Sequence, residues 1–163
     1  MPYRKAEKHE VKRFRLTTLC YIEKDGAWLM LHRTKKQADQ SHDKWLGIGG
    51  KFEDAESPEE CMLREVYEET GLTVTDYDYR GIVTFVSDVW ETEYMHLFTA
   101  TGFTGKLLDC EEGELAWIPK EEVLGLKLWE GDKLFLERLM GDSEFFSLKV
   151  VYEGEKLASW KFF

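Results

Sequence analysis

The sequence predicts an α+β (α/β) fold in which a mixed β-sheet is flanked by helices. Segments with strand-like patterns dominate the chain, and they do not alternate regularly with helices as a doubly wound parallel sheet requires. At 163 residues the chain is long enough for one domain with a sizeable core and too short for two. With no repeat or linker-like segment in sight, we expect one domain over residues 1–163.

The first two strands are expected to form a hairpin. They cover Phe14 to Ile22 and Ala27 to Arg33 and are joined through Lys24-Asp25-Gly26, a strong turn signal. The polar loop that follows, Thr34 to Lys44, is basic at Lys35 and Lys36 and lacks periodicity. We therefore expect this loop to be exposed and mobile.

A helix with clear limits is expected next. Ser57-Pro58-Glu59-Glu60 supplies an N-cap serine, a proline at the first helical position and a glutamate three residues after the cap. Gly71 stands just past the helix end, where a left-handed residue is favoured. The apolar positions expected to form its buried stripe are Met62, Leu63, Val66 and Tyr67.

Three further strands, a second helix and a closing hairpin complete the expected elements. The strand candidates are Tyr79 to Val86, Tyr94 to Thr101 and Glu114 to Ile118. The second helix is expected from Asp132 to Met140, with Gly141 closing it. Around Glu153-Gly154, the final hairpin pairs Phe145 to Tyr152 with Lys156 to Phe162.

Composition limits the classes of partner. A hydrophobic fraction of 43% and a charged fraction of 33% are typical of a soluble globular protein, and no apolar run suits a membrane helix. Met1 to Lys5 has no apolar stretch behind it, so we expect no secretory signal, no membrane and a cytoplasmic location. The net charge of −10 disfavours binding to a nucleic acid polymer, whereas a small anionic substrate bridged by a metal ion stays compatible.

The cysteines do not indicate a site. Cys20, Cys61 and Cys110 are dispersed and include no C-x-x-C pair, which argues against a disulfide framework and against zinc. We expect each to be an ordinary half-buried thiol.

An acidic cluster on the first helix is the main candidate for chemistry. Spacings of three and four residues place Glu65, Glu68 and Glu69 on one side, where they repel each other unless a cation such as Mg²⁺ or Mn²⁺ binds. The alternative is a solvated acidic face that Arg64 offsets. The glycine-rich turn Gly47-Ile48-Gly49-Gly50-Lys51, which lets a backbone approach phosphate or metal, precedes this helix and favours the functional interpretation.

Together these two segments resemble the Nudix family. Gly50, five residues, Glu56, seven residues, Arg64-Glu65-Val66, one residue, Glu68-Glu69, one residue and Gly71-Leu72 form a complete Nudix box over residues 50–72. The resemblance implies an α/β/α sandwich around a mixed sheet, and a hydrolase of a nucleoside diphosphate linked to another group.

The resemblance also implies roles for individual residues. It implies metal binding, by Mg²⁺ with Mn²⁺ as a substitute, through the carbonyl of Gly49 and the carboxylates of Glu65, Glu68 and Glu69. Arg64 would orient the carboxylates, Lys51 would lie near the phosphates, and Glu65 or Glu68 could act as the base. A further metal carboxylate usually comes from a later loop, and Glu112 in Cys110-Glu111-Glu112-Gly113 fits that place best, the alternative being a solvated acidic turn.

Outside the box, the chain resembles MutT-type diphosphatases of oxidised purine nucleotides. In those relatives an aromatic residue and an acid at the positions of Trp129 and Asp132 contact the base. The alternatives are a core aromatic for Trp129 and a helix N-cap for Asp132. Relatives often carry Asn where this chain has Leu46, and leucine cannot hydrogen-bond a purine edge.

The sequence thus predicts a metal-dependent nucleoside triphosphate pyrophosphohydrolase that acts on a small nucleotide such as 8-oxo-dGTP and releases the monophosphate and pyrophosphate. The competing hypotheses are a Nudix hydrolase of ADP-ribose or a dinucleoside polyphosphate, and a nucleotide-binding regulator without activity. The exact substrate, the identity of the base and the oligomeric state are left open by the sequence.

Overall fold

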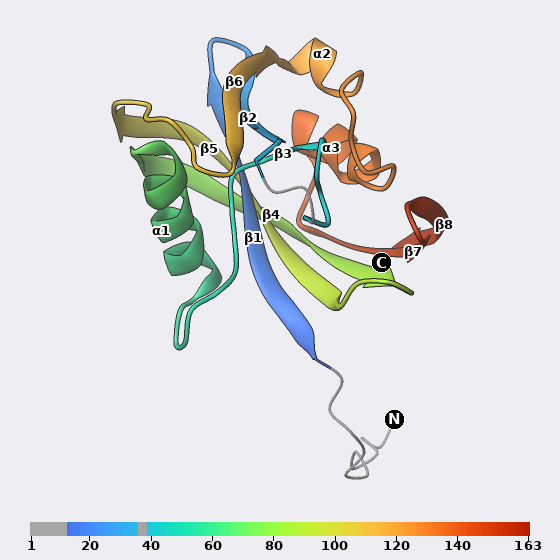
Figure 1. Ribbon diagram of the computed structural model, residues 1–163. Coiled ribbons are helices and arrows are strands. Elements are labelled where there is room, and N and C mark those ends of the chain that lie inside the picture. Colours follow the sequence, from blue (N-terminus) through green and yellow to red (C-terminus); the bar gives the residue numbers. More distant parts are fainter. Residues whose placement is uncertain (1–12, 36–38) are drawn as a thin grey trace.

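A mixed sheet with helices on both sides forms the part of the chain that the computed structural model describes, residues 13–35 and 39–163 (Figure 1). The helices are α1 (Pro58–Thr70), α2 (Lys120–Val123) and α3 (Asp132–Met140). The strands are β1 (Phe14–Lys24), β2 (Ala27–Arg33), β3 (Trp45–Leu46), β4 (Leu72–Ser87), β5 (Thr92–Gly105), β6 (Gly113–Pro119), β7 (Phe146–Glu153) and β8 (Lys156–Phe162). The expected fold class is confirmed. Lys36 and the N-terminal segment on which the signal and location were argued lie outside the described residues.

The strand order combines parallel and antiparallel pairs. The sheet runs β3-β2-β1-β5-β4-β7-β8, and β6 pairs with β2 beside this path. β1 lies parallel to β5 and β4 lies parallel to β7, whereas the other pairs are antiparallel. The expected first and last hairpins, β1-β2 and β7-β8, are both present. The central β1-β5 pair carries side chains to both faces of the sheet.

Alternation along β1 divides the core into two clusters. Leu19 and Tyr21 belong to the cluster that includes α3, whereas Cys20 and Ile22 belong to the cluster that includes α1. Successive residues of a strand point to opposite faces, so one apolar strand supplies both cores. In Figure 1, α1 lies on one side of the sheet and α3 on the other.

Helix α1 has the predicted limits. The Ser57 hydroxyl accepts from the Glu60 N–H at 3.1 Å, and the Glu60 carboxylate accepts from the Ser57 N–H at 3.1 Å. Gly71 ends the helix in the left-handed conformation with a φ of 78°. These contacts satisfy donors and acceptors that the helix ends leave unpaired.

The predicted buried stripe of α1 is wrong at Tyr67, which is 61% exposed. Met62 and Val66 are buried as expected, and Thr70 extends their row by a further four residues. Tyr67 follows Val66 by one residue, and the helix turns by about 100° per residue, so its side chain leaves the row. Leu63 is only partly buried against this core.

The middle of the chain forms longer strands than expected. The predicted Tyr79 to Val86 lies within β4, and the predicted Tyr94 to Thr101 lies within β5. Register shifts between Val74 and Gly81 keep the two strands paired past the points where the sequence pattern weakens. Strand β3 and helix α2 were not predicted, whereas α3 covers the predicted residues.

The loop before β3 is not exposed as predicted over residues 39–44. Lys44 is buried, its ammonium donates to Glu155 Oε1 at 2.7 Å, and its Nζ lies 4.4 Å from the Trp129 ring centre. These contacts fix the described end of the loop against β7-β8 and the segment before α3. They place loop residues over one face of the sheet.

The cysteines and the helices add two further observations. Cys20, Cys61 and Cys110 are free and fully buried rather than half-buried. Across residues 13–35 and 39–163, none of the helices has the length and apolar character needed to cross a membrane.

Candidate active site

A cavity of about 800 Å³ lies over the same face of the sheet on which α3 packs. Its floor comes from β1, β4 and β5, and the loop at residues 39–41 covers it. All the site residues predicted from the sequence line this cavity except Arg64 and Glu68. Those that line it are Leu46, Gly49, Lys51, Glu65, Glu69, Glu112, Trp129 and Asp132.

Three carboxylates gather at the end of the cavity next to α1. Burial raises the pKa of Glu69, and the nearby charges of Glu112 and Glu65 raise it further. Burial likewise raises the pKa of Glu65, although Arg64 opposes the shift. Glu69 Oε2 is buried and has no hydrogen-bond partner among the described residues. This end therefore carries more negative charge than its own contacts compensate.

Arg33 compensates part of that charge. Its Nη1 donates to Glu112 Oε2 at 2.8 Å, and its Nε donates to Asp39 of the covering loop. The predicted alternative for Glu112, a solvated acidic turn, does not fit a side chain that lines the cavity and is 28% exposed.

Arg64 organises the acids of α1 from outside the cavity. Its Nε and Nη2 donate to the two oxygens of Glu56 at 2.6 and 2.9 Å, and this contact lowers the pKa of Glu56 to about 2. Its Nη1 donates to Glu65 at 2.9 Å and to Glu68 at 3.0 Å. Glu68 is 54% exposed and turned toward this guanidinium, which explains why it does not line the cavity.

The glycine-rich turn passes close to β1 and α1. A Cβ on Gly49 would lie 1.7 Å from the Thr18 carbonyl oxygen, and a Cβ on Gly50 would lie 2.5 Å from the Glu65 carboxylate. Three backbone hydrogen bonds hold the turn against β1. The Cys20 N–H donates to the Ile48 carbonyl at 2.6 Å, the Ile48 N–H donates to the Cys20 carbonyl at 2.9 Å, and the Thr18 N–H donates to the Gly50 carbonyl at 2.9 Å. Only glycine fits at position 49, where the chain passes the Thr18 backbone this closely.

The acidic end suits a hard divalent cation by its chemistry. Its donors are carboxylate oxygens, the ligands that Mg²⁺ and Mn²⁺ prefer, and the unpartnered buried oxygen of Glu69 is one of them. In the described part of the chain, no three His, Cys, Asp or Glu side chains are already arranged as a ligand set. Because Arg64 holds Glu65 and Glu68, a cation would have to draw them from that guanidinium.

Trp129 and Asp132 lie at the other end of the cavity. The Trp129 Nε1 donates to Ser41 Oγ at 3.0 Å, and its ring packs edge-on against Phe85 and Tyr152. Trp129 is 4% exposed, so the core-aromatic interpretation and the cavity-wall interpretation both describe it. Leu46 supplies an apolar part of the same wall.

Asp132 is not the N-cap of α3. The cap residue is Gly131, no side chain caps the helix, and Asp132 is its first residue. The Asp132 side chain is buried, and burial together with the charge of Glu93 raises its pKa to about 8, against the opposing charge of Lys44. A buried carboxyl group on a cavity wall whose raised pKa favours its uncharged form is a common feature of functional sites.

Sequence reasoning missed the polar floor of the cavity. Arg15 and Thr17 of β1 share the face of Leu19, and Glu93 of β5 shares the face of Met95. Gln40 of the covering loop accepts from Arg15 Nη2 at 2.5 Å. A signal existed, because period-two alternation puts charged residues at positions that continue the buried face of each strand.

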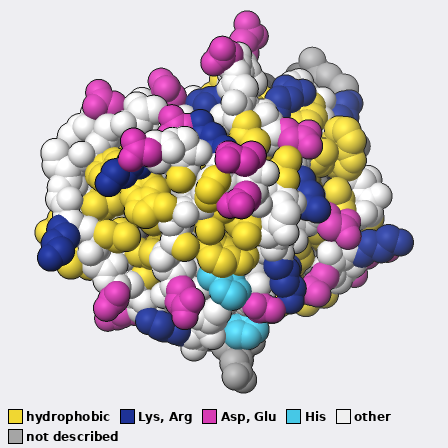
Figure 2. Space-filling model, turned by 90° about the horizontal axis from the view of Figure 1, so that it is seen from above, with side chains coloured by type: hydrophobic (Ala, Val, Ile, Leu, Met, Phe, Trp, Pro, Cys, Tyr) yellow, Lys and Arg dark blue, Asp and Glu magenta, His cyan; other side chains and the backbone are white. Residues whose placement is uncertain are grey.

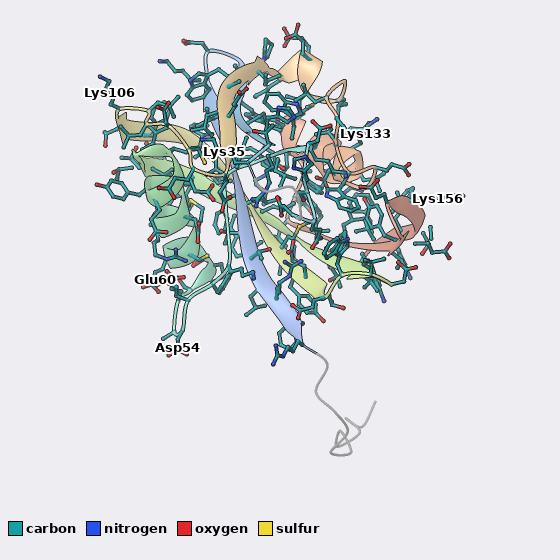
Figure 3. The ribbon with its side chains drawn as sticks, viewed as in Figure 1. Lys35, Asp54, Glu60, Lys106, Lys133 and Lys156 are labelled. Carbon is teal, nitrogen blue, oxygen red and sulfur yellow. The ribbon has the colours of Figure 1, made fainter. Side chains whose placement is uncertain are left out.

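The described residues on the face shown in Figure 2 form no continuous basic patch. On the face shown in Figure 2, acidic and basic side chains are intermixed around exposed apolar ones. Among the lysines labelled in Figure 3, Lys106 follows β5, Lys133 lies on α3 and Lys156 lies on β8. These lysines belong to a chain whose net charge is −10.

Comparison with known proteins places this geometry in context. The NUDIX domain profile matches residues 13–139. The chain is 30% identical over 128 residues to the Nudix hydrolase YvcI of Bacillus subtilis, covering 76% of this chain and 77% of that protein. It is 29% identical over 133 residues to the oxidized purine nucleoside triphosphate hydrolase of Danio rerio, covering 80% and 83%. The crystal structure of the mutator MutT protein from Bacillus halodurans is similar with a TM-score of 0.81 and 28% identity, covering 91% of this chain and 97% of that chain.

Proposed function

The chain belongs to the Nudix hydrolase family, and from this premise we propose that it is a divalent-metal-dependent nucleoside triphosphate pyrophosphohydrolase of oxidised purine nucleotides such as 8-oxo-dGTP. The observation that carries the proposal is one cavity with two different ends. Acids suited to a cation and phosphates line one end, and Trp129 with Asp132 lines the other. A nucleoside triphosphate has the same division between a charged chain and an aromatic base.

The acidic end would bind the metal through Glu65, Glu68, Glu69, Glu112 and the Gly49 carbonyl. A bound divalent cation lowers the pKa of water and neutralises charge on phosphate oxygens. Lys51, which lines the cavity, would bind the phosphate chain as a cation. Arg64 would hold the carboxylates of α1 in place through the contacts it makes with Glu56 and Glu65.

In the proposed reaction, water attacks a phosphorus of the triphosphate and the anhydride bond to the departing pyrophosphate breaks. The water proton passes to a carboxylate, and the nucleoside monophosphate is released. Between the two candidates for this base, the position of Glu65 in the cavity supports Glu65 over Glu68. Its raised pKa also suits a group that must accept a proton near neutral pH.

The purine base of the nucleotide would stack against Trp129 and contact the carboxyl group of Asp132. The oxidized purine nucleoside triphosphate hydrolase of Danio rerio, to which the chain is similar, supports this choice of substrate. Leu46 would add apolar contact but no hydrogen bond, so Asp132 must supply polar recognition at this end.

A substrate panel tests the proposal. With Mg²⁺ present, kcat/KM should be highest for an oxidised guanine triphosphate, and pyrophosphate should be released with the monophosphate. A panel in which ADP-ribose or a dinucleoside polyphosphate outperforms every triphosphate would contradict the substrate. Nucleotide binding without turnover of any compound would instead indicate a regulator.

Two substitutions on α1 test the metal site. Glu69→Gln and Glu68→Gln keep the size of the side chain and remove its charge, so kcat should fall by more than roughly 100-fold, beyond the loss typical of a residue that only supports a ligand. The matched control is Glu59→Gln, on the same helix but outside the cavity, which should keep normal turnover. Near-normal turnover of both the Glu68 and the Glu69 variants at saturating Mg²⁺ would refute the assignment.

A further inference from the structure

The floor of the cavity carries a buried ion pair that the proposed chemistry does not use. Arg15 and Glu93 are register partners on the parallel strands β1 and β5, and Arg15 Nη2 lies 3.0 Å from Glu93 Oε1. The side chains are only 22% and 15% exposed, and both line the cavity. A buried ion pair adds little stability over an apolar pair of similar volume, so its presence on a cavity wall suggests a ligand.

Two buried polar atoms of this floor make no hydrogen bond to a described residue within the usual geometric limits. Thr17 Oγ1 lies beside Glu93, and Thr17 is 8% exposed. Arg15 Nε lies 3.9 Å from Glu91 Oε2. A buried polar group without a hydrogen bond carries a penalty that a ligand with matching groups removes. The floor thus offers both acceptors and donors to a molecule in the cavity.

Glu93 and Asp132 line the same cavity. The charge of Glu93 raises the pKa of Asp132, which places the two carboxyl groups within electrostatic reach across the cavity. Leu46, on the wall of the same cavity, cannot form a hydrogen bond through its side chain. Polar recognition of a base at this end therefore depends on Asp132 and on the floor.

We propose that Glu93 is a second specificity-determining carboxylate, which accepts a hydrogen bond from an N–H group on the edge of a purine base while Arg15 and Thr17 hold it in position. This inference rests on the proposed function, since it assigns a further contact within the same substrate pocket. Purines rich in N–H donors, such as guanine and its oxidised form, fit two acceptors better than purines that lack them.

The test compares substrate ratios in Glu93→Gln. The amide of glutamine keeps the size of the side chain, but its NH₂ group replaces one carboxylate oxygen that could accept a hydrogen bond from the purine base. The first ratio is kcat/KM for dGTP over dITP, which lacks the exocyclic amine, and the second is 8-oxo-dGTP over dGTP, which lacks the N7–H donor. At least one ratio should fall by about fivefold or more, because a donor on the base then loses its acceptor.

A matched control variant separates recognition from a general change in charge. Glu91 lies 3.9 Å from the same guanidinium, is 46% exposed and does not line the cavity, so Glu91→Gln should leave both ratios unchanged. Thermal melts of both variants check folding. If Glu93→Gln does not fold, Glu93→Asp keeps the charge, draws the carboxylate back from the base, and is measured by the same two ratios.

The outcomes distinguish the two proposals. If the unaltered enzyme hydrolyses the triphosphates and both ratios change by less than about fivefold in the Glu93 variant, Glu93 does not read the base and only this inference is overturned. If the unaltered enzyme hydrolyses none of these triphosphates, the proposed function fails and the assignment of Glu93 falls with it.

Discussion

Asp132 is a carboxyl group in surroundings that favour its neutral form. It is 8% exposed, Glu93 faces it from the cavity floor, and Lys44 opposes that charge only in part. The alternative role as a helix cap would have made Asn an equivalent replacement, but Gly131 holds the cap position. Asp132→Asn therefore removes a buried acid that titrates. We expect the stability of the unaltered protein, but not that of the variant, to depend on pH through this group.

The free energy of unfolding should reveal this titration. In the folded protein the pKa of Asp132 is raised from 3.8 to about 8. Below about pH 4 the carboxyl group is protonated in both the folded and the unfolded chain, and its contribution to stability is fully present. As the pH rises toward 8, only the unfolded chain releases this proton, so the contribution is lost. Asp132→Asn does not titrate, so it should gain stability relative to the unaltered protein across this window, by at most about 1.4 kcal/mol per pH unit. Urea unfolding at several pH values measures the difference.

The exposed Asp142, just beyond α3, supplies the control, because Asp142→Asn should track the unaltered protein at every pH. A difference between Asp132→Asn and the unaltered protein that stays constant from acid to alkaline pH would contradict the raised pKa. In kinetics, the same variant should also shift the kcat/KM ratio between oxidised and plain guanine nucleotides if Asp132 contacts the base.

At the scale of elements, α1 shows how local signals position a site. Its capping box and its left-handed Gly71 fix where the helix begins and ends, and hence which residues face the cavity. Glu65 and Glu69 face it because they follow Met62 and Val66 by three residues and share the side of the helix that docks on the sheet. The glycine-rich turn then passes so close to the Glu65 carboxylate that a side chain at Gly50 would displace this carboxylate.

Ser57→Ala tests the first of these signals. Loss of the hydroxyl that accepts from Glu60 N–H should reduce the free energy of unfolding by about 1 kcal/mol, the usual effect of removing a helix N-cap. Ser159→Ala, on the exposed face of β8, is the control and should have little effect. Equal stability of the two variants in chemical denaturation would show that the cap contributes nothing measurable.

At the scale of the molecule, the sheet divides two cores and the cavity opens on one of them. The acidic end receives Glu65 and Glu69 from α1 and Glu112 from the loop before β6, segments far apart in the sequence. With a net charge of −10 on the chain, a cation at this end would relieve local repulsion as well as help to bind the proposed substrate. Metal binding should therefore stabilise the whole fold.

Thermal unfolding measures this linkage. Mg²⁺ or Mn²⁺ at about 100 times its Kd should raise the free energy of unfolding by about 2.7 kcal/mol. Because burial raises the pKa of Glu69 and of Glu65, protons compete with the cation, so the gain should be larger at about pH 8 than at about pH 6. Glu69→Gln should lose most of the gain and Glu59→Gln should keep it; equal gains in both variants would place the cation elsewhere.

Local chemistry made a large part of this protein predictable from its sequence. The hairpin turns, the limits of α1 and α3, and the mixed sheet follow from turn residues, capping residues and periodicity, which act over a few neighbouring positions. The Nudix box is equally local, because its acids share one helix and its glycines directly precede that helix. The family assignment therefore needed no tertiary contact.

Only the tertiary structure decided which side chains share the cavity. Arg15 and Glu93 meet because β1 and β5 pair in parallel, a long-range register that no local pattern encodes. Asp132 is a buried acid rather than the helix cap that was its alternative role, because α3 docks against the sheet. Sequence periodicity determines which face a residue occupies, whereas burial, charge and pKa depend on what the fold packs against that face.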